Sequence, residues 1–289
     1  MNVGVVGNPR YGDLESVLRQ LAREAPGRRM ALFTEPSLVT LWENPVPLLD
    51  EAPLNVLITF GGDGTLLRGA RMLHGREVPI LGVNLGRVGF LTTATRDGLT
   101  AALDTLQGAN YLLERRLALT AAIESEAGDV RSEQQALNDI AIHKAGVARV
   151  IRVRVLIEGE DLGPFSADGI IVSSPTGSTA YSLSAGGPIV APDVEAMVIT
   201  PVCAHTLAVR PLVVPAGYTI SIEPLAPGGD DLLISYDGQV GASLAAGDKV
   251  LVRRAAGMVQ LIRLGHEGYF SRMRQKLHWG DLADREVIR

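Results

Sequence analysis

A turn of three glycines and one aspartate follows directly on an apolar run, and it constrains the fold of this chain more than any other stretch. Residues 56–60 read Val-Leu-Ile-Thr-Phe, and residues 61–65 read Gly-Gly-Asp-Gly-Thr. A short apolar run that is rich in β-branched residues is typical of a strand buried on both faces. After the turn, four apolar residues fall on one helical stripe, namely Leu66, Leu67, Ala70 and Leu73. The pattern therefore predicts a strand, a tight turn and then a helix.

The turn combines the features of a phosphate site with one carboxylate. Glycines at a helix N-terminus let backbone N–H groups and the positive end of the helix dipole point at one spot, which suits a phosphate. A carboxylate is unfavourable in a pure anion site, so Asp63 is better explained as a group that accepts a proton or meets a metal ion. A purely local turn role for Asp63 is the alternative.

Two well-known phosphate-binding motifs do not match this turn. It lacks the Lys-Ser/Thr pair of a Walker loop. Leu67 stands where the dinucleotide-binding fingerprint needs its third glycine. The turn is therefore a phosphate-site candidate of a different kind.

Composition limits the partners and the compartment. The 289 residues carry 27 Lys and Arg against 32 Asp and Glu, a net charge of −5 at pH 7. This balance argues against broad binding to nucleic acid or anionic membranes, and no apolar run approaches the length that spans a membrane. Cys203 is the only cysteine, so no internal disulfide can form and a thiolate-built zinc site is excluded. We expect a soluble, cytoplasmic protein without nucleic-acid or membrane partners.

The pattern of predicted secondary structure changes near residue 110. Before that point, apolar runs that suit strands alternate with helical patterns, which implies a parallel sheet with helices on its faces. After it, short strand patterns follow one another, as where Ile151, Val153 and Val155 alternate with Arg152 and Arg154. Residues 249–253 and 259–264 are expected to form two separate strands. A helical stripe closes the chain, formed by Tyr269, Phe270, Met273 and Leu277.

These patterns predict an α/β fold with two domains. We expect a Rossmann-like parallel-sheet domain over residues 1–108 and an all-β, sandwich-like domain over residues 109–265. A C-terminal helix within residues 266–289 is expected to pack back on the first domain. Because ligands of parallel sheets bind at the carboxyl ends of strands, the glycine turn lies where a site is expected.

Three further stretches carry candidate binding residues. Residues 84–91 place two spaced glycines after an apolar strand, which an ordinary tight turn explains about as well as a close approach to a ligand. Asn138 and Asp139 could pair with a purine edge or ribose hydroxyls, or lie in an exposed turn. Residues 168–188 run from a strand into a segment dense in Ser, Thr and Gly, whose N–H and O–H groups suit phosphates and sugars.

Together these stretches resemble the NAD kinase family, which transfers a phosphoryl group to the 2′-hydroxyl of the adenosine ribose of NAD. Residues 201–211 and 237–239 are similar to the family as well, and the order of the motifs matches across most of the chain. The Gly-Gly-Asp-Gly turn alone is shared with diacylglycerol and sphingosine kinases. The hydroxyl-rich stretch is what favours NAD kinase.

The resemblance implies a role for each matching residue. Asp63 would be the general base that accepts the proton of the ribose hydroxyl. The donor phosphates of ATP, together with Mg²⁺, would lie on Gly61, Gly62, Gly64 and Thr65. The residues implied in NAD binding are Asp63, Gly64, Arg68, Asn138, Asp139, Arg149, Asp168, Thr176, Thr179, Ala180, Tyr181, Ser184 and Gln239. The resemblance also implies a homodimer or homotetramer, and it leaves polyphosphate open as a second donor.

The chain departs from the family pattern at three positions. Asp139 stands where the family usually has Glu, which shortens the reach of the carboxylate by about 1.5 Å. Ser166 stands where many members have Arg, and Arg149 is the candidate for the missing charge. Ala204 stands where a Pro often precedes His205, a change that we expect to be tolerated.

Two other functions share parts of this pattern. A lipid kinase of the diacylglycerol or sphingosine type would share the glycine turn, but it would need an exposed apolar groove or membrane-binding face. A non-catalytic module that senses NAD or another nucleotide could use the same fold. ATP-dependent formation of NADP separates all three.

Overall fold

The computed structural model describes residues 1–50, 52–86, 89–144, 150–206, 208–225, 232–245, 247–265 and 268–279. The chain divides into two compact units, which are described separately. Unit 1 comprises residues 1–72, 78–114 and 260–289, and unit 2 comprises residues 73–77 and 115–259. The boundaries expected near residues 108 and 265 stay predictions.

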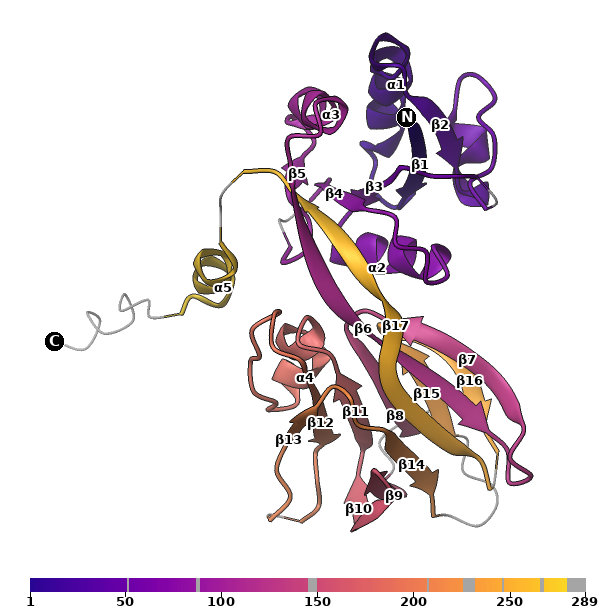
Figure 1. Cartoon of the computed structure of the whole chain (residues 1–289), viewed down its shortest axis with the longest axis vertical. Helices are drawn as coiled ribbons and strands as arrows, with labels where there is room; N and C mark the ends of the chain where they lie inside the picture. Colours follow the sequence, from indigo (N-terminus) through magenta and orange to yellow (C-terminus); the bar gives the residue numbers. More distant parts are fainter. Residues whose placement is uncertain are drawn as a thin grey trace, which may run out of the picture. The chain divides into compact units, whose positions relative to one another are not determined.

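Unit 1 is built on a parallel sheet (Figure 1). Its strands are β1 (Asn2–Gly7), β2 (Ala31–Thr34), β3 (Val56–Gly61), β4 (Ile80–Asn84) and β5 (Ala94–Thr95). They pair in the order β5-β4-β3-β1-β2, and every pair is parallel. The end of a long strand, β17 (Lys249–Arg263), pairs parallel with β4 through Leu261 and Ile80. This sheet confirms the parallel α/β architecture.

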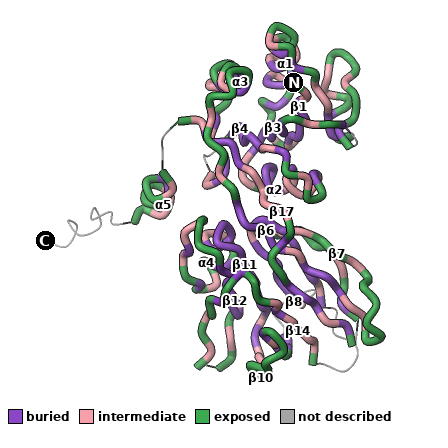
Figure 2. Tube along the Cα trace, viewed as in Figure 1, coloured by how far each residue is buried: buried purple, intermediate pink, exposed green. Residues whose placement is uncertain are grey.

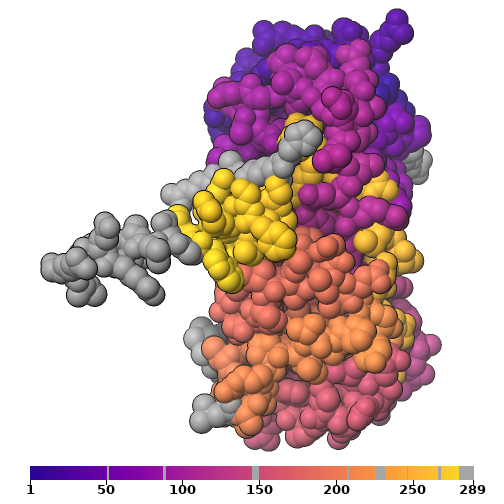
Figure 3. Space-filling model, turned by 60° about the vertical axis from the view of Figure 1, so that its left-hand side comes forward, coloured from indigo at the N-terminus to yellow at the C-terminus, as the bar shows by residue number. Residues whose placement is uncertain are grey.

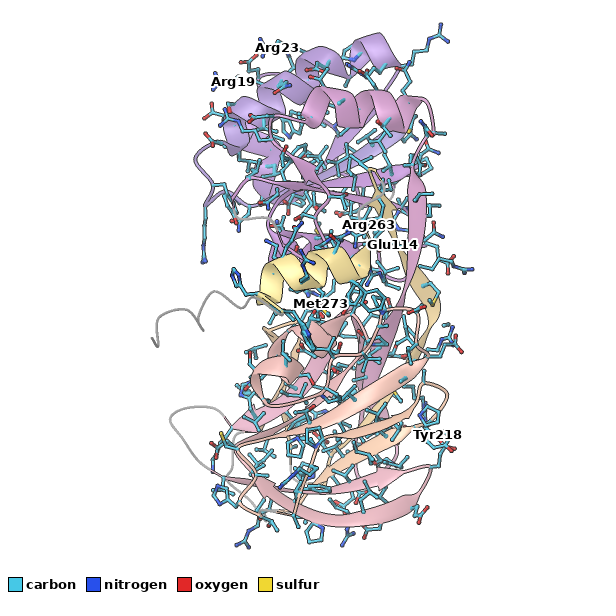
Figure 4. All side chains as sticks on the ribbon, turned by 90° about the vertical axis from the view of Figure 1, so that its left-hand side faces the viewer. Arg19, Arg23, Glu114, Tyr218, Arg263 and Met273 are labelled. Atoms are coloured by element: carbon cyan, nitrogen blue, oxygen red, sulfur yellow. The ribbon has the colours of Figure 1, made fainter. Side chains whose placement is uncertain are left out.

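Helices cover the sheet of unit 1 and close its core. They are α1 (Leu14–Glu24), α2 (Asp63–Met72) and α3 (Leu99–Gln107), with short 3₁₀ segments η1 (Pro26–Arg28) and η2 (Pro36–Leu41). The unit also contains the helix α5 (Tyr269–Leu277). All six residues of β3 are buried, and the buried face of α1 carries Leu14, Val17, Leu18 and Leu21 (Figure 2). Arg19 and Arg23 lie on the exposed face of α1 (Figure 4). The core thus follows the period-3.6 pattern of the sequence.

Unit 2 consists of two antiparallel layers with one core. The first sheet has the order β13-β12-β11-β8-β15-β16. Its strands are β8 (Asp139–Lys144), β11 (Gly169–Ser173), β12 (Ala196–Val202), β13 (Leu212–Pro215), β15 (Leu232–Tyr236) and β16 (Gln239–Leu244). The second layer contains β6 (Leu112–Glu124), β7 (Val130–Ala136), β9 (Ile151–Ile157), β10 (Glu160–Ala167), β14 (Ile220–Pro224) and β17. Two short helices, η3 (Gly177–Thr179) and α4 (Tyr181–Ser184), follow β11.

The core of unit 2 explains why the two layers pack together. Ile142 and Val172 from the first sheet lie in the same buried cluster as Leu119, Val153 and Val250 from the second layer. Along β9, buried residues alternate with exposed arginines, as the period-two pattern predicts. The all-β, sandwich-like second domain is confirmed.

Two expectations about the end of the chain need correction. Residues 249–253 and 259–264 were expected to form separate strands, but they belong to the single strand β17. Helix α5 belongs to unit 1, as expected, and Figure 3 shows it in yellow beside magenta atoms of that unit. However, Phe270 on its expected apolar stripe is 67 % exposed, and the buried residue of α5 is Arg272. The other three residues of the stripe, Tyr269, Met273 and Leu277, are half-buried.

No helix in the described part of the chain is both long enough and apolar enough to cross a membrane.

Candidate active site

The glycine turn lies between β3 and α2 of unit 1, at the carboxyl end of a buried strand. Strand β3 ends at Gly61, and α2 begins at Asp63. The Thr65 N–H donates to the Gly62 carbonyl at 2.9 Å, which closes the first turn of the helix. The positive end of the helix dipole therefore lies at the turn, where it favours bound anions and the Asp63 carboxylate.

Backbone N–H groups of residues 90–92 hold the Asp63 carboxylate. Phe90 N–H donates to Oδ2 at 2.7 Å, and the N–H groups of Leu91 and Thr92 donate to Oδ1 at 3.1 and 3.2 Å. A carboxylate offers about four lone-pair sites, so one site on Oδ2 remains by this count. The carboxylate is thus fixed in direction and can still accept one hydrogen bond from a substrate hydroxyl.

Gly89 permits this close approach of the 90–92 segment. A Cβ atom on Gly89 would lie 2.0 Å from Oδ1 of Asp63, far inside contact distance. The glycine in the stretch 84–91 is therefore explained by its contact with the carboxylate. Close approach of this stretch to a ligand stays a prediction, because the observed contact is with a protein carboxylate.

Arg68 lies one turn into α2 and bonds to protein groups. Its guanidinium forms an ion pair with Glu35, which is 2 % exposed, and it donates to the Gly7 carbonyl at 2.6 Å. Glu35 also accepts the Gly7 N–H at 2.8 Å. Arg68 therefore ties α2 to the end of β1, and its phosphate role stays a prediction.

In unit 2, Asn138 and Asp139 lie at the start of β8 and are held by Asp237. Oδ1 of Asp237 accepts the Asn138 N–H at 2.7 Å and the Asp139 N–H at 3.4 Å, and Oδ2 accepts the Leu137 N–H at 3.2 Å. The Asp237 N–H in turn donates to the Asp139 carbonyl at 2.9 Å. This reciprocal bonding fixes the dipeptide, and the exposed-turn interpretation is wrong because Asp139 is 4 % exposed.

The carboxyl of Asp139 lies in an unusual environment. Burial, together with the smaller effect of the negative charge of Asp237, raises the pKa of Asp139 to about 7. The group therefore changes its charge near neutral pH. A carboxyl of this kind can either accept or donate a hydrogen bond under working conditions.

The hydroxyl-rich segment follows β11 and meets Asn138. Ser174 N–H donates to the Asn138 carbonyl at 2.9 Å, and Ser174 Oγ–H donates to the Leu137 carbonyl at 2.5 Å. A Cβ atom on Gly177 would lie 2.0 Å from the Asn138 carbonyl oxygen, so only glycine fits there. Thr176 is buried and receives a 3.4 Å hydrogen bond from the buried Arg116.

The other predicted residues of this segment lie around the same turn. Thr179 Oγ1–H donates to the Thr176 carbonyl at 3.2 Å. Thr179 and Ala180 are half-buried, and Tyr181 and Ser184 are exposed. Gln239 is exposed and begins β16, directly after the turn that carries Asp237. One end of the first sheet of unit 2 therefore gathers Asn138, Asp139, Gln239 and the hydroxyl-rich segment.

Two predicted residues lie apart from this group. Asp168 precedes β11 and lies at the opposite end of that strand, roughly 20 Å from Ser174 at the usual strand rise. Its carboxylate lies 3.8 Å from the His205 side chain. Arg149 lies outside the described residues.

Sequence reasoning missed the groups that hold the site residues in place. The N–H groups of residues 90–92 are backbone donors, which no side-chain pattern reveals. Asp237 was part of a recognised stretch, but its spacing gives no sign that its carboxylate accepts the N–H groups at the start of β8. Glu35 and Arg272 have no local signal, because their partners lie 33 and 182 residues away.

Family models match nearly the whole chain. The model for the ATP-NAD kinase N-terminal domain matches residues 5–111, and the model for the ATP-NAD kinase C-terminal domain matches residues 137–264.

Curated relatives match it with comparable coverage. An NAD kinase of Gemmatimonas aurantiaca is 45 % identical over 287 residues, which is 99 % of each chain. An NAD kinase of Desulforamulus reducens is 38 % identical over 95 % of this chain and 96 % of its own.

Solved structures share the fold. A yeast NADH kinase complexed with NADH has a TM-score of 0.87 at 24 % identity, covering 97 % of this chain and 88 % of the yeast chain. An Archaeoglobus fulgidus NAD kinase in complex with ATP has a TM-score of 0.70 at 24 % identity, covering 96 % and 99 %. Given two matching family models and relatives of this similarity, the chain belongs to the NAD kinase family.

Proposed function

We propose that this enzyme transfers the γ-phosphoryl group of ATP to the 2′-hydroxyl of the adenosine ribose of NAD, with Asp63 as the general base. The observation that carries the proposal is the Asp63 carboxylate, which three backbone N–H groups orient at the N-terminus of α2. Phosphoryl transfer depends mainly on positioning and charge stabilisation, so a fixed acceptor beside a phosphate site is what the reaction needs. The family membership leaves the lipid-kinase alternative without support.

The glycine turn supplies the phosphate site in this proposal. Gly61, Gly62, Gly64 and Thr65 present backbone to the donor phosphates, and the positive end of α2 offsets part of their charge. Bound Mg²⁺ would neutralise more of the phosphate charge. Among the described residues, no group of three or more His, Cys, Asp or Glu side chains could hold a metal. In this proposal the donor phosphates and water would hold Mg²⁺ at the turn, because the one remaining lone pair of Asp63 is assigned to the ribose hydroxyl.

NAD recognition is assigned to the end of the first sheet of unit 2 at which Asn138, Asp139, Gln239 and the hydroxyl-rich segment lie. Asn138 and Asp139 would hold the adenine and ribose, and Gln239 would close the pocket. The hydroxyl-rich segment would line it through Thr176, Thr179, Ala180, Tyr181 and Ser184. Support comes from the rigid backbone of the dipeptide, which Asp237 and Ser174 hold from two sides.

Three assignments of binding residues remain predictions. Arg68 contacts a phosphate in this proposal while three of its hydrogen bonds go to Glu35 and Gly7. Asp168 would act on the nicotinamide side of NAD. Arg149 would replace the arginine that many members carry where Ser166 stands.

We also propose a cytoplasmic homodimer or homotetramer, on the resemblance to the family. Size-exclusion chromatography with light scattering measures the state directly.

The proposal is tested by incubating the purified chain with NAD, ATP and Mg²⁺ and measuring NADP. We expect NADP to form in amounts that depend on ATP, and polyphosphate in place of ATP tests the donor range. Calorimetric titration with NAD is run on the same preparation. NAD binding without any NADP would overturn the proposal and favour a sensing module.

A further inference from the structure

We infer that Arg272 of the C-terminal helix is a positioning residue for Asp63, acting through the peptide groups of residues 90–92. This inference rests on the proposed role of Asp63 as the general base. All the residues involved belong to unit 1.

The connection runs through the peptide group between Phe90 and Leu91. Nη1 of Arg272 donates to the Phe90 carbonyl at 2.9 Å, and the N–H at the other end of that peptide group, on Leu91, donates to Asp63 Oδ1 at 3.1 Å. Because the peptide is planar, its carbonyl and N–H point in opposite directions. The guanidinium of Arg272 and the carboxylate of Asp63 therefore bond to opposite sides of the same planar peptide group.

A second arginine supports the same segment. Arg263, the last residue of β17, donates from Nη1 to the Leu91 carbonyl at 3.5 Å and from Nη2 to the Phe90 carbonyl at 3.4 Å. The Thr92 N–H, which belongs to the Leu91–Thr92 peptide group, donates to Asp63 Oδ1 at 3.2 Å. Since the Arg263 bonds are longer, Arg272 makes the stronger connection.

Burial of the two arginines removes their guanidinium groups from water, which costs free energy unless protein groups bond to them. Arg263 is 4 % exposed and Arg272 is 5 % exposed. Figure 4 shows Glu114 beside Arg263, and its Oε2 lies 2.8 Å from Nε of Arg263. Taking a guanidinium group out of water is unfavourable unless hydrogen bonds to charged or polar groups compensate. The carbonyls of residues 90 and 91 supply that compensation, and hydrogen-bonded chains of this kind strengthen one another.

A cavity beside the two arginines allows the contact of Arg272 to be tested with a small molecule that replaces its side chain. It has a volume of about 70 Å³, and both Arg263 and Arg272 line it together with residues 92–95, 264 and 265. Removal of the Arg272 side chain would enlarge a cavity that already exists. A small guanidinium ion could then enter and replace the missing group.

The test compares Arg272→Ala with Arg274→Ala in the full chain. Arg274 lies on the same helix, is exposed, and loses the same charge. We expect Arg272→Ala to lower kcat roughly 10- to 100-fold, because small misplacements of a reacting group are costly, with the KM values for NAD and ATP within about twofold. Arg274→Ala should stay within twofold of the unmodified chain, and Arg272→Lys should lose less than Arg272→Ala.

Two further readouts separate positioning from a general structural role. Millimolar guanidinium ion should restore part of the turnover of Arg272→Ala and none of that of Asp63→Asn. In an Asp63→Asn background, Arg272→Ala should cost little more, because the group that it positions is already gone. If Arg272→Ala does not fold, Arg272→Lys carries the same comparisons.

Several outcomes would overturn the inference. They are wild-type kcat in folded Arg272→Ala, no response to guanidinium ion, or a loss that multiplies fully with that of Asp63→Asn. Failure of the proposed function looks different, because the unmodified chain would then form no NADP, or Asp63→Asn would keep normal turnover.

Discussion

Oδ2 of Asp63 accepts the N–H of Phe90 at 2.7 Å across 27 residues of sequence, so the carboxylate at the glycine turn is fixed by the loop after the neighbouring strand. Three N–H donors hold the group in total. The three donors stabilise the ionised carboxylate and fix its direction, so it does not have to reorganise when a hydroxyl approaches it.

The first prediction concerns the base itself. Asp63→Asn should lower kcat by at least about 100-fold, since a positioned base contributes about 10²–10⁴-fold, while NAD still binds. The amide cannot take the proton, and its NH₂ group cannot accept the Phe90 N–H. Steady-state kinetics and calorimetric NAD titration measure the two effects. The control is Asp97→Asn, an exposed position of the same unit. Near-normal turnover of Asp63→Asn would contradict the assignment of Asp63 as the general base.

The second prediction concerns the room beside the carboxylate. Gly89→Ala should lower kcat by at least about tenfold, because its Cβ would lie 2.0 Å from Asp63 Oδ1 and must displace the carboxylate or the segment. Gly12→Ala is the matched control, since a Cβ there meets no atom of the described residues within 4 Å. Kinetics of the two variants at equal concentration provide the comparison. Equal rates would show that the carboxylate does not need its present position.

The third prediction concerns the contact between the hydroxyl-rich segment and Asn138. Gly177→Ala puts a Cβ 2.0 Å from the Asn138 carbonyl oxygen, and overpacking of this kind costs about 1–3 kcal/mol of unfolding free energy. We expect the KM for NAD to rise at least about tenfold, because the strain falls on the dipeptide that we propose holds the nucleoside. Gly217→Ala is the control for the added methyl group. An unchanged KM for NAD would remove Asn138 from the NAD site.

The fourth prediction follows from the pKa of Asp139, which is raised to about 7. A raised carboxyl pKa means that the ionised form is penalised in the folded state. The penalty is full above about pH 7, shrinks as the pH falls, and vanishes below the ordinary value of 3.8. Asp139→Asn should therefore raise the melting temperature at pH 8 and raise it less at pH 5.

Thermal unfolding at the two pH values checks this sign. The exposed Asp193 of the same unit supplies the control, because Asp193→Asn should shift the melting temperature little at either pH. A larger gain at pH 5 than at pH 8 would mean that the folded state favours the charged form of Asp139.

Local pattern was enough to predict most of the fold. Strand β3 and helix α1 follow from apolar periodicity, and the glycine turn falls between β3 and α2 as expected. The break expected within β17 was wrong because a long paired strand tolerates Gly257 in its interior. The expected apolar stripe of α5 was wrong at Phe270, which is exposed, while Tyr269, Met273 and Leu277 are half-buried. No sequence pattern indicated the buried Arg272, because its acceptor, the Phe90 carbonyl, is distant along the chain.

The candidate site was only partly visible in the sequence. Asp63, Asn138 and Asp139 stand out by residue type and neighbours. The groups that orient them are backbone N–H donors or side chains far along the chain, such as Asp237, 99 residues from Asn138. Pairing at that separation is decided by the assembled sheet, which no window of sequence contains.

Unit 1 is completed only by residues 260–289, which follow the whole of unit 2 along the chain. During synthesis the glycine turn emerges before unit 2, whereas Arg263 and Arg272 emerge after it. Chains begin to fold from their N-terminus as they are made, so the arginine contacts to the 90–92 segment form only after unit 2 has been synthesised. By our inference, a product that stalls before Arg263 would carry the Asp63 carboxylate without the two arginines that support its donors.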